Sequence, residues 1–115
     1  MCEPISVDVK RFKTETGLED SDVKELYKGF VVELLEELEK LQVQLSKDDF
    51  EKMARTVHNI KGISSSYMAD QVFTCSVELG RALSNNNRSD IISPMNRLIE
   101  AIQEAADDIS RLIRS

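Results

Sequence analysis

Hydrophobic residues recur along most of this chain at alternating intervals of three and four, which is the period of an amphipathic helix. The longest such run begins after the polar residues at 20–22 and carries a glutamate-rich opposite face. The pattern predicts one long helix in the first half of the chain, with a single side packed against a core. Its apolar positions are Val23, Leu26, Tyr27, Phe30, Leu34, Leu38, Leu41 and Leu45.

A short amphipathic segment precedes this helix. Ile5, Val9 and Phe12 share one side of a helix that we expect over residues 5–15. Residues 1–4 are expected to be disordered, as chain termini often are.

Three more helices are predicted downstream, with turn residues at 85–87 separating the last two. Pro94 is expected in or before the first turns of the last helix, where a missing N–H costs little. The helices run from about 50 to 67 after a cap within 47–49, from about 70 to 83 with Asp70 as the cap, and from Ser89 or Ser93 to Ile113.

Short connections between long amphipathic helices make neighbouring helices antiparallel. The sequence therefore predicts an all-α fold: an up-down antiparallel four-helix bundle over residues 20–115, with the short extra N-terminal helix packed across it. The 115 residues fit one domain spanning 1–115. Because such a bundle completes its own core, we expect a monomer.

Composition narrows the functional classes. The net charge is −6 and Trp is absent, which disfavours a nucleic-acid partner. No apolar run approaches the roughly 20 residues of a membrane span, and the N-terminus lacks the pattern of a secretory signal. We therefore expect a soluble, cytoplasmic protein without a membrane partner, in which Cys2 and Cys75 are free thiols. One histidine and two separated cysteines predict no metal site.

The single histidine, His58, lies on the polar side of its predicted helix. On a helical wheel it falls roughly 130° from the centre of the apolar stripe. Lys61, Gly62 and Ser65 follow it at i+3, i+4 and i+7, and Arg55 precedes it at i−3. The only histidine is therefore expected on a solvent-facing, locally basic strip of an otherwise acidic chain.

This arrangement suits phosphoryl transfer through imidazole, because a neutral imidazole is nucleophilic and histidine forms covalent intermediates. Lys61 is expected to neutralise charge on the phosphoryl oxygens, and Ser65 or Ser64 to add a hydrogen bond. A mid-helix glycine costs about 1 kcal/mol relative to alanine. We interpret Gly62 as leaving access for the active site of a partner.

The segment from His58 to Ala69 resembles the signature of histidine-containing phosphotransfer (HPt) domains: His, two residues, Lys-Gly, one residue, a small residue, then a short interval to Gly-Ala or Gly-Leu. Met68 stands where the family usually has glycine, a departure that we expect to affect close helix packing. Gly80 replaces a glutamate that is frequent in the family. The matching positions are His58, Lys61, Gly62, Ser64 and Ala69.

The resemblance implies a phosphocarrier without kinase activity. It would accept a phosphoryl group on His58 from a receiver-domain aspartate, or from a histidine kinase, and pass it to another receiver. The implied partners are receiver domains of response regulators and of hybrid histidine kinases, which supply the Mg²⁺, so that this chain binds no cofactor. A basic rim is expected to complement their acidic sites, and the residues expected to contact them are Arg55, Lys47, Ala54 and Asn59.

Two other functions compete with this interpretation. A helical docking module would bind a signalling partner through the same helix without phosphorylation, but degenerate domains of that kind typically lack the histidine. A hydrolytic enzyme would use His58 as a general base, and would need converging groups in a pocket that the bundle does not suggest. Gly62 also has a structural alternative, as a packing glycine between helices. Ser64 falls on the apolar side, which favours a close-packed role.

Overall fold

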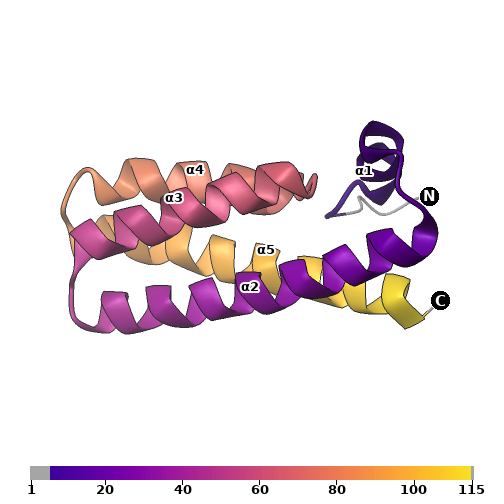
Figure 1. Ribbon diagram of the computed structural model, residues 1–115. Helices are drawn as coiled ribbons and strands as arrows, with labels where there is room; N and C mark the ends of the chain where they lie inside the picture. Colours follow the sequence, from indigo (N-terminus) through magenta and orange to yellow (C-terminus); the bar gives the residue numbers. More distant parts are fainter. Residues whose placement is uncertain (1–5, 115) are drawn as a thin grey trace, which may run out of the picture.

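The computed structural model describes residues 6–114, and within that range the chain is all-α (Figure 1). The sequence-based prediction of the fold class is therefore confirmed. The disorder expected for residues 1–4 and the predicted role of Ile5 lie outside the described residues. The helices are α1 (Val9–Thr16), α2 (Asp20–Ser46), α3 (Phe50–Ser66), α4 (Asp70–Leu83) and α5 (Arg88–Arg114).

Helices α2 to α5 form an up-down antiparallel bundle. α3 packs between α2 and α4, and α5 closes the bundle by packing on α4 and α2. α2 and α5 have 27 residues each and are longer than the α3–α4 pair, so they extend beyond it at one end, where α1 lies (Figure 1). The short N-terminal helix therefore covers an end of the bundle rather than its side.

The apolar stripes predicted from the sequence form the core. Every predicted stripe residue of α2 from Val23 to Leu41 is buried except Leu26, which is 39% exposed. Leu26 precedes Tyr27 by one residue, and a step of 100° around the helix carries it out of the seam that Tyr27 fills. The largest side chains of the core are Tyr27, Phe30, Leu34, Leu41, Met53, Ile60, Leu79, Ile91, Met95, Leu98, Ile102 and Ile109.

The first helix begins later than predicted. Asp8 caps α1 by accepting a 3.1 Å hydrogen bond from the backbone N–H of Arg11, so the helix starts at Val9 rather than at residue 5. The preceding Ser6 donates its hydroxyl to Asp108 of α5 at 2.5 Å, and its backbone N–H to the same carboxylate at 3.3 Å. These long-range bonds hold the segment before α1 outside any helix.

An aromatic cluster attaches α1 to the bundle. The ring of Phe12 stacks on Tyr67 at a centroid distance of 5.3 Å and meets the edge of Tyr27 at 5.1 Å. The Tyr27 hydroxyl donates a 2.6 Å hydrogen bond to the carbonyl of Tyr67. Since Tyr67 is the C-cap residue of α3, this cluster also fixes where α3 ends.

The end of α3 explains the unusual methionine. The N–H of Ala69 donates to the carbonyl of Ser64 at 2.9 Å and that of Met68 to Ser65 at 3.3 Å, which is the Schellman pattern. Met68 takes a φ of +58°, in the left-handed region that favours glycine. A glycine at this position would adopt the left-handed backbone conformation without strain, so the structure adds a backbone role to the packing role expected from the sequence.

The other helix ends agree with the prediction in part. Asp49 caps α3, accepting from the N–H of Lys52 at 3.2 Å. Asp70 was expected to cap α4 but is its first residue, and Ala69 occupies the cap position without a side-chain bond. Asp70 instead lies 3.7 Å from Arg11 of α1. Pro94 is inside α5, in its second turn, where the carbonyl of Asp90 loses its usual donor.

Candidate functional site

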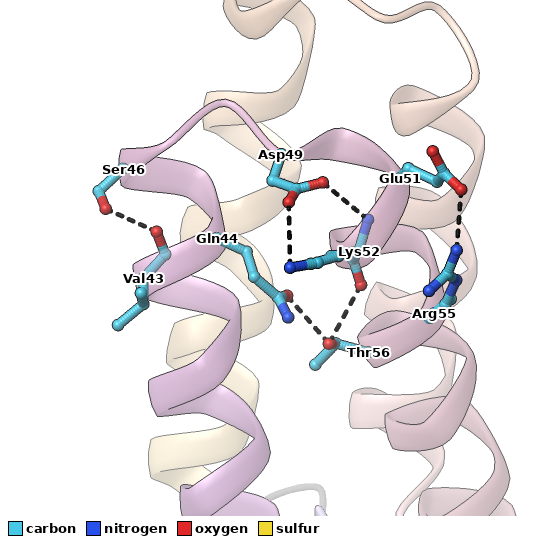
Figure 2. A network of polar contacts seen from close by, with 8 residues as sticks. All are labelled: Val43, Gln44, Ser46, Asp49, Glu51, Lys52, Arg55 and Thr56. Atoms are coloured by element: carbon cyan, nitrogen blue, oxygen red, sulfur yellow. Dashed lines mark hydrogen bonds and ion pairs between the residues drawn. The ribbon is translucent and has the colours of Figure 1, made fainter.

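Two neighbouring residues show which sides of α3 face α2 and α4. On one side the Thr56 hydroxyl donates to Gln44 Oε1 of α2 at 2.9 Å (Figure 2). On the other, the position that a Cβ of Gly80 would take on α4 lies 3.8 Å from Cγ1 of Val57. His58 is the next residue, and it is exposed near the middle of α3.

The residues around His58 leave its imidazole open. Among residues 6–114, neither His58 nor Lys61 has a hydrogen bond or ion pair, so both side chains are available to a ligand. A Cβ built on Gly62 would meet no heavy atom within 4 Å. This excludes the packing alternative for Gly62 within the described structure, because no neighbouring helix occupies that space.

The two serines that follow have different environments. Ser64 is fully buried and donates its hydroxyl to the carbonyl of Ile60 at 2.6 Å, so it has the close-packed role expected from its side of the wheel. Ser65 is exposed, and its hydroxyl has no hydrogen bond within the described part of the chain. It lies two turns beyond His58, about 10 Å along the helix axis.

The basic strip is weaker than the sequence suggests. Arg55 pairs with Glu51 one turn earlier, with Nη2 2.8 Å from Oε1 (Figure 2). Lys52 lies 3.8 Å from Asp49 at the start of the same helix. The sequence contained the signal for this pair. Glu51 precedes Arg55 by four residues, and oppositely charged side chains at i,i+4 lie side by side on a helix. Lys61 is therefore the cation nearest His58 on α3 that has no acidic partner among residues 6–114.

The remaining predicted contact residues are spread around α3. Ala54 and Asn59 are exposed on the outward half of the helix. Lys47 ends α2 and lines an open groove between α2 and the start of α3, together with Lys40 and Lys52. About 12 Å of helix separate Phe50, the first residue of α3, from His58, so the structure does not bring Lys47 beside the imidazole.

The described structure gives little support to a metal site, a membrane span or a reactive thiol. Among residues 6–114 there is no group of three or more His, Cys, Asp or Glu side chains placed to hold a metal ion. No described helix is long and apolar enough to cross a membrane. Cys75 is half-buried on α4, and burial raises the pKa of its thiol, which disfavours the reactive thiolate.

A helical bundle with one exposed, unpaired histidine on an outer helix face is the arrangement of a histidine phosphotransfer domain. The family model of the Hpt domain matches residues 25–112. The chain therefore belongs to the Hpt domain family, whose members have phosphotransfer roles in two-component signalling and act as carriers rather than as catalysts.

Two solved structures share this fold. One is a histidine-containing phosphotransfer protein from rice, with a TM-score of 0.83 and 18% sequence identity, covering 94% of this chain and 79% of that chain. The other is the HPT domain of the Hpt sensor hybrid histidine kinase from Shewanella, with a TM-score of 0.79 and 18% identity, covering 95% of this chain and 94% of that chain. No curated protein sequence matches the chain.

Proposed function

We propose that this protein carries a phosphoryl group on His58 within a phosphorelay. It accepts the group from an aspartyl phosphate of a receiver domain, or from a histidine kinase, and passes it to another receiver. The observation that carries the proposal is the exposed imidazole of His58, unpaired within the described structure and bordered by the open surface at Gly62.

The chemistry needs little from this chain. The imidazole nitrogen attacks phosphorus as the bond from phosphorus to the donor aspartate oxygen breaks, and the carboxylate leaves as an anion. The return step reverses these bonds on a second aspartate. Lys61, one turn beyond His58, places an ammonium group beside the transferred phosphoryl oxygens. The receiver supplies the Mg²⁺, and this chain needs no cofactor of its own.

The role of a carrier also accounts for the bundle. A rigid helix presents the histidine outward, so a receiver can bring its aspartate into line without any rearrangement of the carrier. A hydrolytic enzyme would instead need converging acid, base or nucleophile groups in a pocket. Within four residues of His58 on α3, the described polar side chains are those of Arg55, Thr56, Asn59 and Lys61, and no carboxylate or thiol is among them.

The test is phosphate uptake from phosphorylated receiver domains of the parent organism, with the His58→Gln variant as comparison. We expect acid-labile, base-stable phosphate on the wild-type chain and none on the variant. The variant should keep its helical circular dichroism and its melting temperature, since glutamine suits an exposed helix position. Labelling of the variant near the wild-type rate would refute the assignment. A wild-type chain that binds receivers but never takes up phosphate would favour the docking module.

A further inference from the structure

Helix α2 exposes an apolar stripe that the core does not use. Four of the six large apolar side chains exposed within residues 6–114 lie on this helix. Val32 is 58% exposed, Leu35 44% and Val43 48%, and their spacing at i, i+3 and i+11 places them on one side of the helix. A single exposed apolar side chain is ordinary, but a run along one helix side is typical of a contact surface.

This stripe points away from the rest of the bundle. The midpoint between Val32 and Leu35 lies about 140° around α2 from the centre of the buried stripe that contains Tyr27 and Leu34. It lies about 150° from Gln44, whose side chain bonds α3. No described helix covers this outer side of α2, because its packing partners α3 and α5 lie toward the core (Figure 1).

Opposite charges flank the two central residues of the stripe. Lys28 precedes Val32 by four residues, and Glu39 follows Leu35 by four. Within the described residues, Lys28 has only a long contact of 3.8 Å with Glu25, and both side chains are more than half exposed. Glu39 has no ion pair among residues 6–114. We call Lys28, Val32, Leu35 and Glu39 the α2 seam, and its steps of four, three and four are those of a helix side that faces another helix.

The α2 seam is complementary to itself in the antiparallel direction. Val32 and Leu35 lie equally far from the centre of the seam, and so do Lys28 and Glu39. A second copy turned about that centre would therefore place its Leu35 against Val32 and its Glu39 against Lys28, and the symmetry would repeat both contacts. A parallel pairing would oppose Lys28 to Lys28 and Glu39 to Glu39, which is unfavourable.

We infer that two copies of this chain associate through the α2 seam as an antiparallel, two-fold symmetric dimer. Val32 and Leu35 of both copies form its apolar centre, and Lys28 and Glu39 form an ion pair at each end. The monomer expected from the sequence followed from the complete core of the bundle. The seam lies outside that core, so the same fold leaves it free to bind a second copy.

The dimer is weak and leaves the histidine accessible. One helix side from each copy makes a small interface, and each chain carries a net charge of −6, which opposes association. We expect a dissociation constant of about 100 µM. α3 packs on the side of Gln44, away from the seam, so both copies present His58. Because the seam shares no residue with the candidate site, the inference does not depend on phosphoryl transfer.

Sedimentation equilibrium of the whole chain tests the dimer. Between about 10 µM and 1 mM the average mass should rise from 13.0 kDa toward twice that value. Leu35→Ala should weaken the dimer about tenfold, because it removes an apolar contact from each of the two copies. Leu26→Ala is the matched control. Leu26 is 39% exposed on the same helix but on the side of Gln44, so its variant should stay within twofold of wild type.

Charge reversal tests the direction of the pairing. Lys28→Glu and Glu39→Lys should each weaken the dimer about tenfold, because either change turns both symmetric ion pairs into repulsions. An equal mixture of the two variants should dimerise like wild type, since each mixed pair again opposes a cation to an anion. Single reversals that leave the dimer unchanged would indicate that like residues face each other, and would overturn the antiparallel seam.

Melting curves at low concentration show whether a variant has lost its fold rather than its interface. If Leu35→Ala melts early, Val32→Lys carries the test, because lysine suits a helix better than valine and brings charge into the apolar centre. Folded Val32→Lys that dimerises like wild type overturns the inference. So does a wild-type chain that stays at 13.0 kDa at about 1 mM, or a loss in Leu26→Ala equal to that in Leu35→Ala.

Labelling of His58 by phosphoramidate, a small donor that needs no docking, tests the placement of α3 outside the interface. The rate constant should be the same at concentrations below and above dimer formation. A rate constant that falls as the dimer forms would place α3 inside the interface and overturn the seam. No labelling at any concentration would contradict only the proposed function, and the sedimentation results would still decide whether the dimer exists.

Discussion

Val57, the residue immediately before His58 in α3, lies 3.8 Å from the position that a Cβ of Gly80 would take on α4. This distance is an ordinary van der Waals contact, so sterics alone do not demand glycine at position 80. At Gly62 the same construction meets nothing within 4 Å. Neither glycine is therefore required by packing, and the one beside His58 is better explained by what approaches it from outside.

Replacing Gly62 by Gln should slow phosphoryl transfer while leaving the fold as stable as wild type or more stable. The added side chain fills the space through which a receiver reaches His58, whereas glutamine suits a helix interior better than glycine by up to about 1 kcal/mol. Transfer from a phosphorylated receiver and thermal melting measure the two effects. We expect a loss of at least tenfold in the transfer rate.

Gly29→Gln is the matched control for this prediction. Gly29 is an exposed glycine inside α2 with no heavy atom within 4 Å of its Cβ position, and it lies beyond the level at which α3 ends. The same substitution there should raise stability similarly and leave transfer unchanged. Equal transfer by the Gly62 and Gly29 variants would contradict the access argument.

Periodicity was enough to predict the helices and the exposed side of α3, because both depend on local spacing. Periodicity did not predict features that depend on contacts between residues far apart in the sequence. The hydrogen bond between Ser6 and Asp108 joins residues 102 apart, so the sequence could not place the start of α1. The left-handed backbone conformation of Met68 could not be predicted from the sequence either. It accompanies the end of α3, where the Tyr27 hydroxyl donates to the carbonyl of Tyr67.

The candidate site was predictable to the same extent. His58, Lys61 and Gly62 share a helix, and their relative placement follows from the helical repeat. The place of Lys47 was not predicted, because its distance from His58 depends on the connection between α2 and α3 rather than on spacing along one helix.

Tyr27→Phe should lower the free energy of unfolding by about 1 kcal/mol, because it removes the hydrogen bond to the Tyr67 carbonyl. Burial raises the pKa of Tyr27 well above its usual value of 10.0. A raised folded pKa contributes stability that is full below the unfolded pKa and is lost as pH rises above it. Denaturant melts should therefore show a constant difference from pH 6 to pH 9 that shrinks above pH 10.

A difference that keeps its size well above pH 10 would contradict the assigned role of the Tyr27 hydroxyl. His58 labelling by phosphoramidate provides the control, because the aromatic cluster lies at the end of α3 and not at the imidazole. We expect labelling of folded Tyr27→Phe to equal that of wild type.

Asp108→Asn should destabilise the attachment of the segment before α1. Burial alone would raise the pKa of the Asp108 carboxyl, but the hydrogen bonds from Ser6 and the contact with Arg111 outweigh it and lower the pKa below its usual 3.8. A lowered folded pKa gives stability that is present above the unfolded value and is lost as pH falls through the folded one. We expect a cost of about 1 kcal/mol at pH 7 that diminishes below pH 4.

The measurement is urea unfolding at several pH values, with Ser6→Ala as the companion variant. Ser6→Ala removes the hydroxyl donor but keeps the carboxylate, so it should cause part of the same loss at neutral pH. If Asp108→Asn is as destabilising at pH 3 as at pH 7, the effect is not electrostatic and the Ser6 contact is not its source.

Arg55→Glu should slow association of the protein with a receiver more than it alters dissociation. The substitution reverses a charge on the outward face of α3, and charges at an interface rim act mainly on the encounter rate. It also sets a second carboxylate one turn from Glu51, and this like-charge pair weakens the helix by only a few tenths of a kcal/mol. Stopped-flow binding at low and high salt measures the effect, and screening should shrink the difference from wild type.

Because Arg55 pairs with Glu51, a variant of Glu51 tests the same prediction with a charge change in the opposite direction. Glu51→Gln removes the carboxylate that lies 2.8 Å from Arg55 and leaves the cation unpaired, so it should speed association with the same acidic receiver at low salt. The two variants change the local charge in opposite directions on one exposed face, and neither side chain contributes to the core. Opposite shifts in association rate that both fade with salt would establish the charge of α3 as part of recognition. Unchanged rates in both would mean that the pair is only a solvated surface contact.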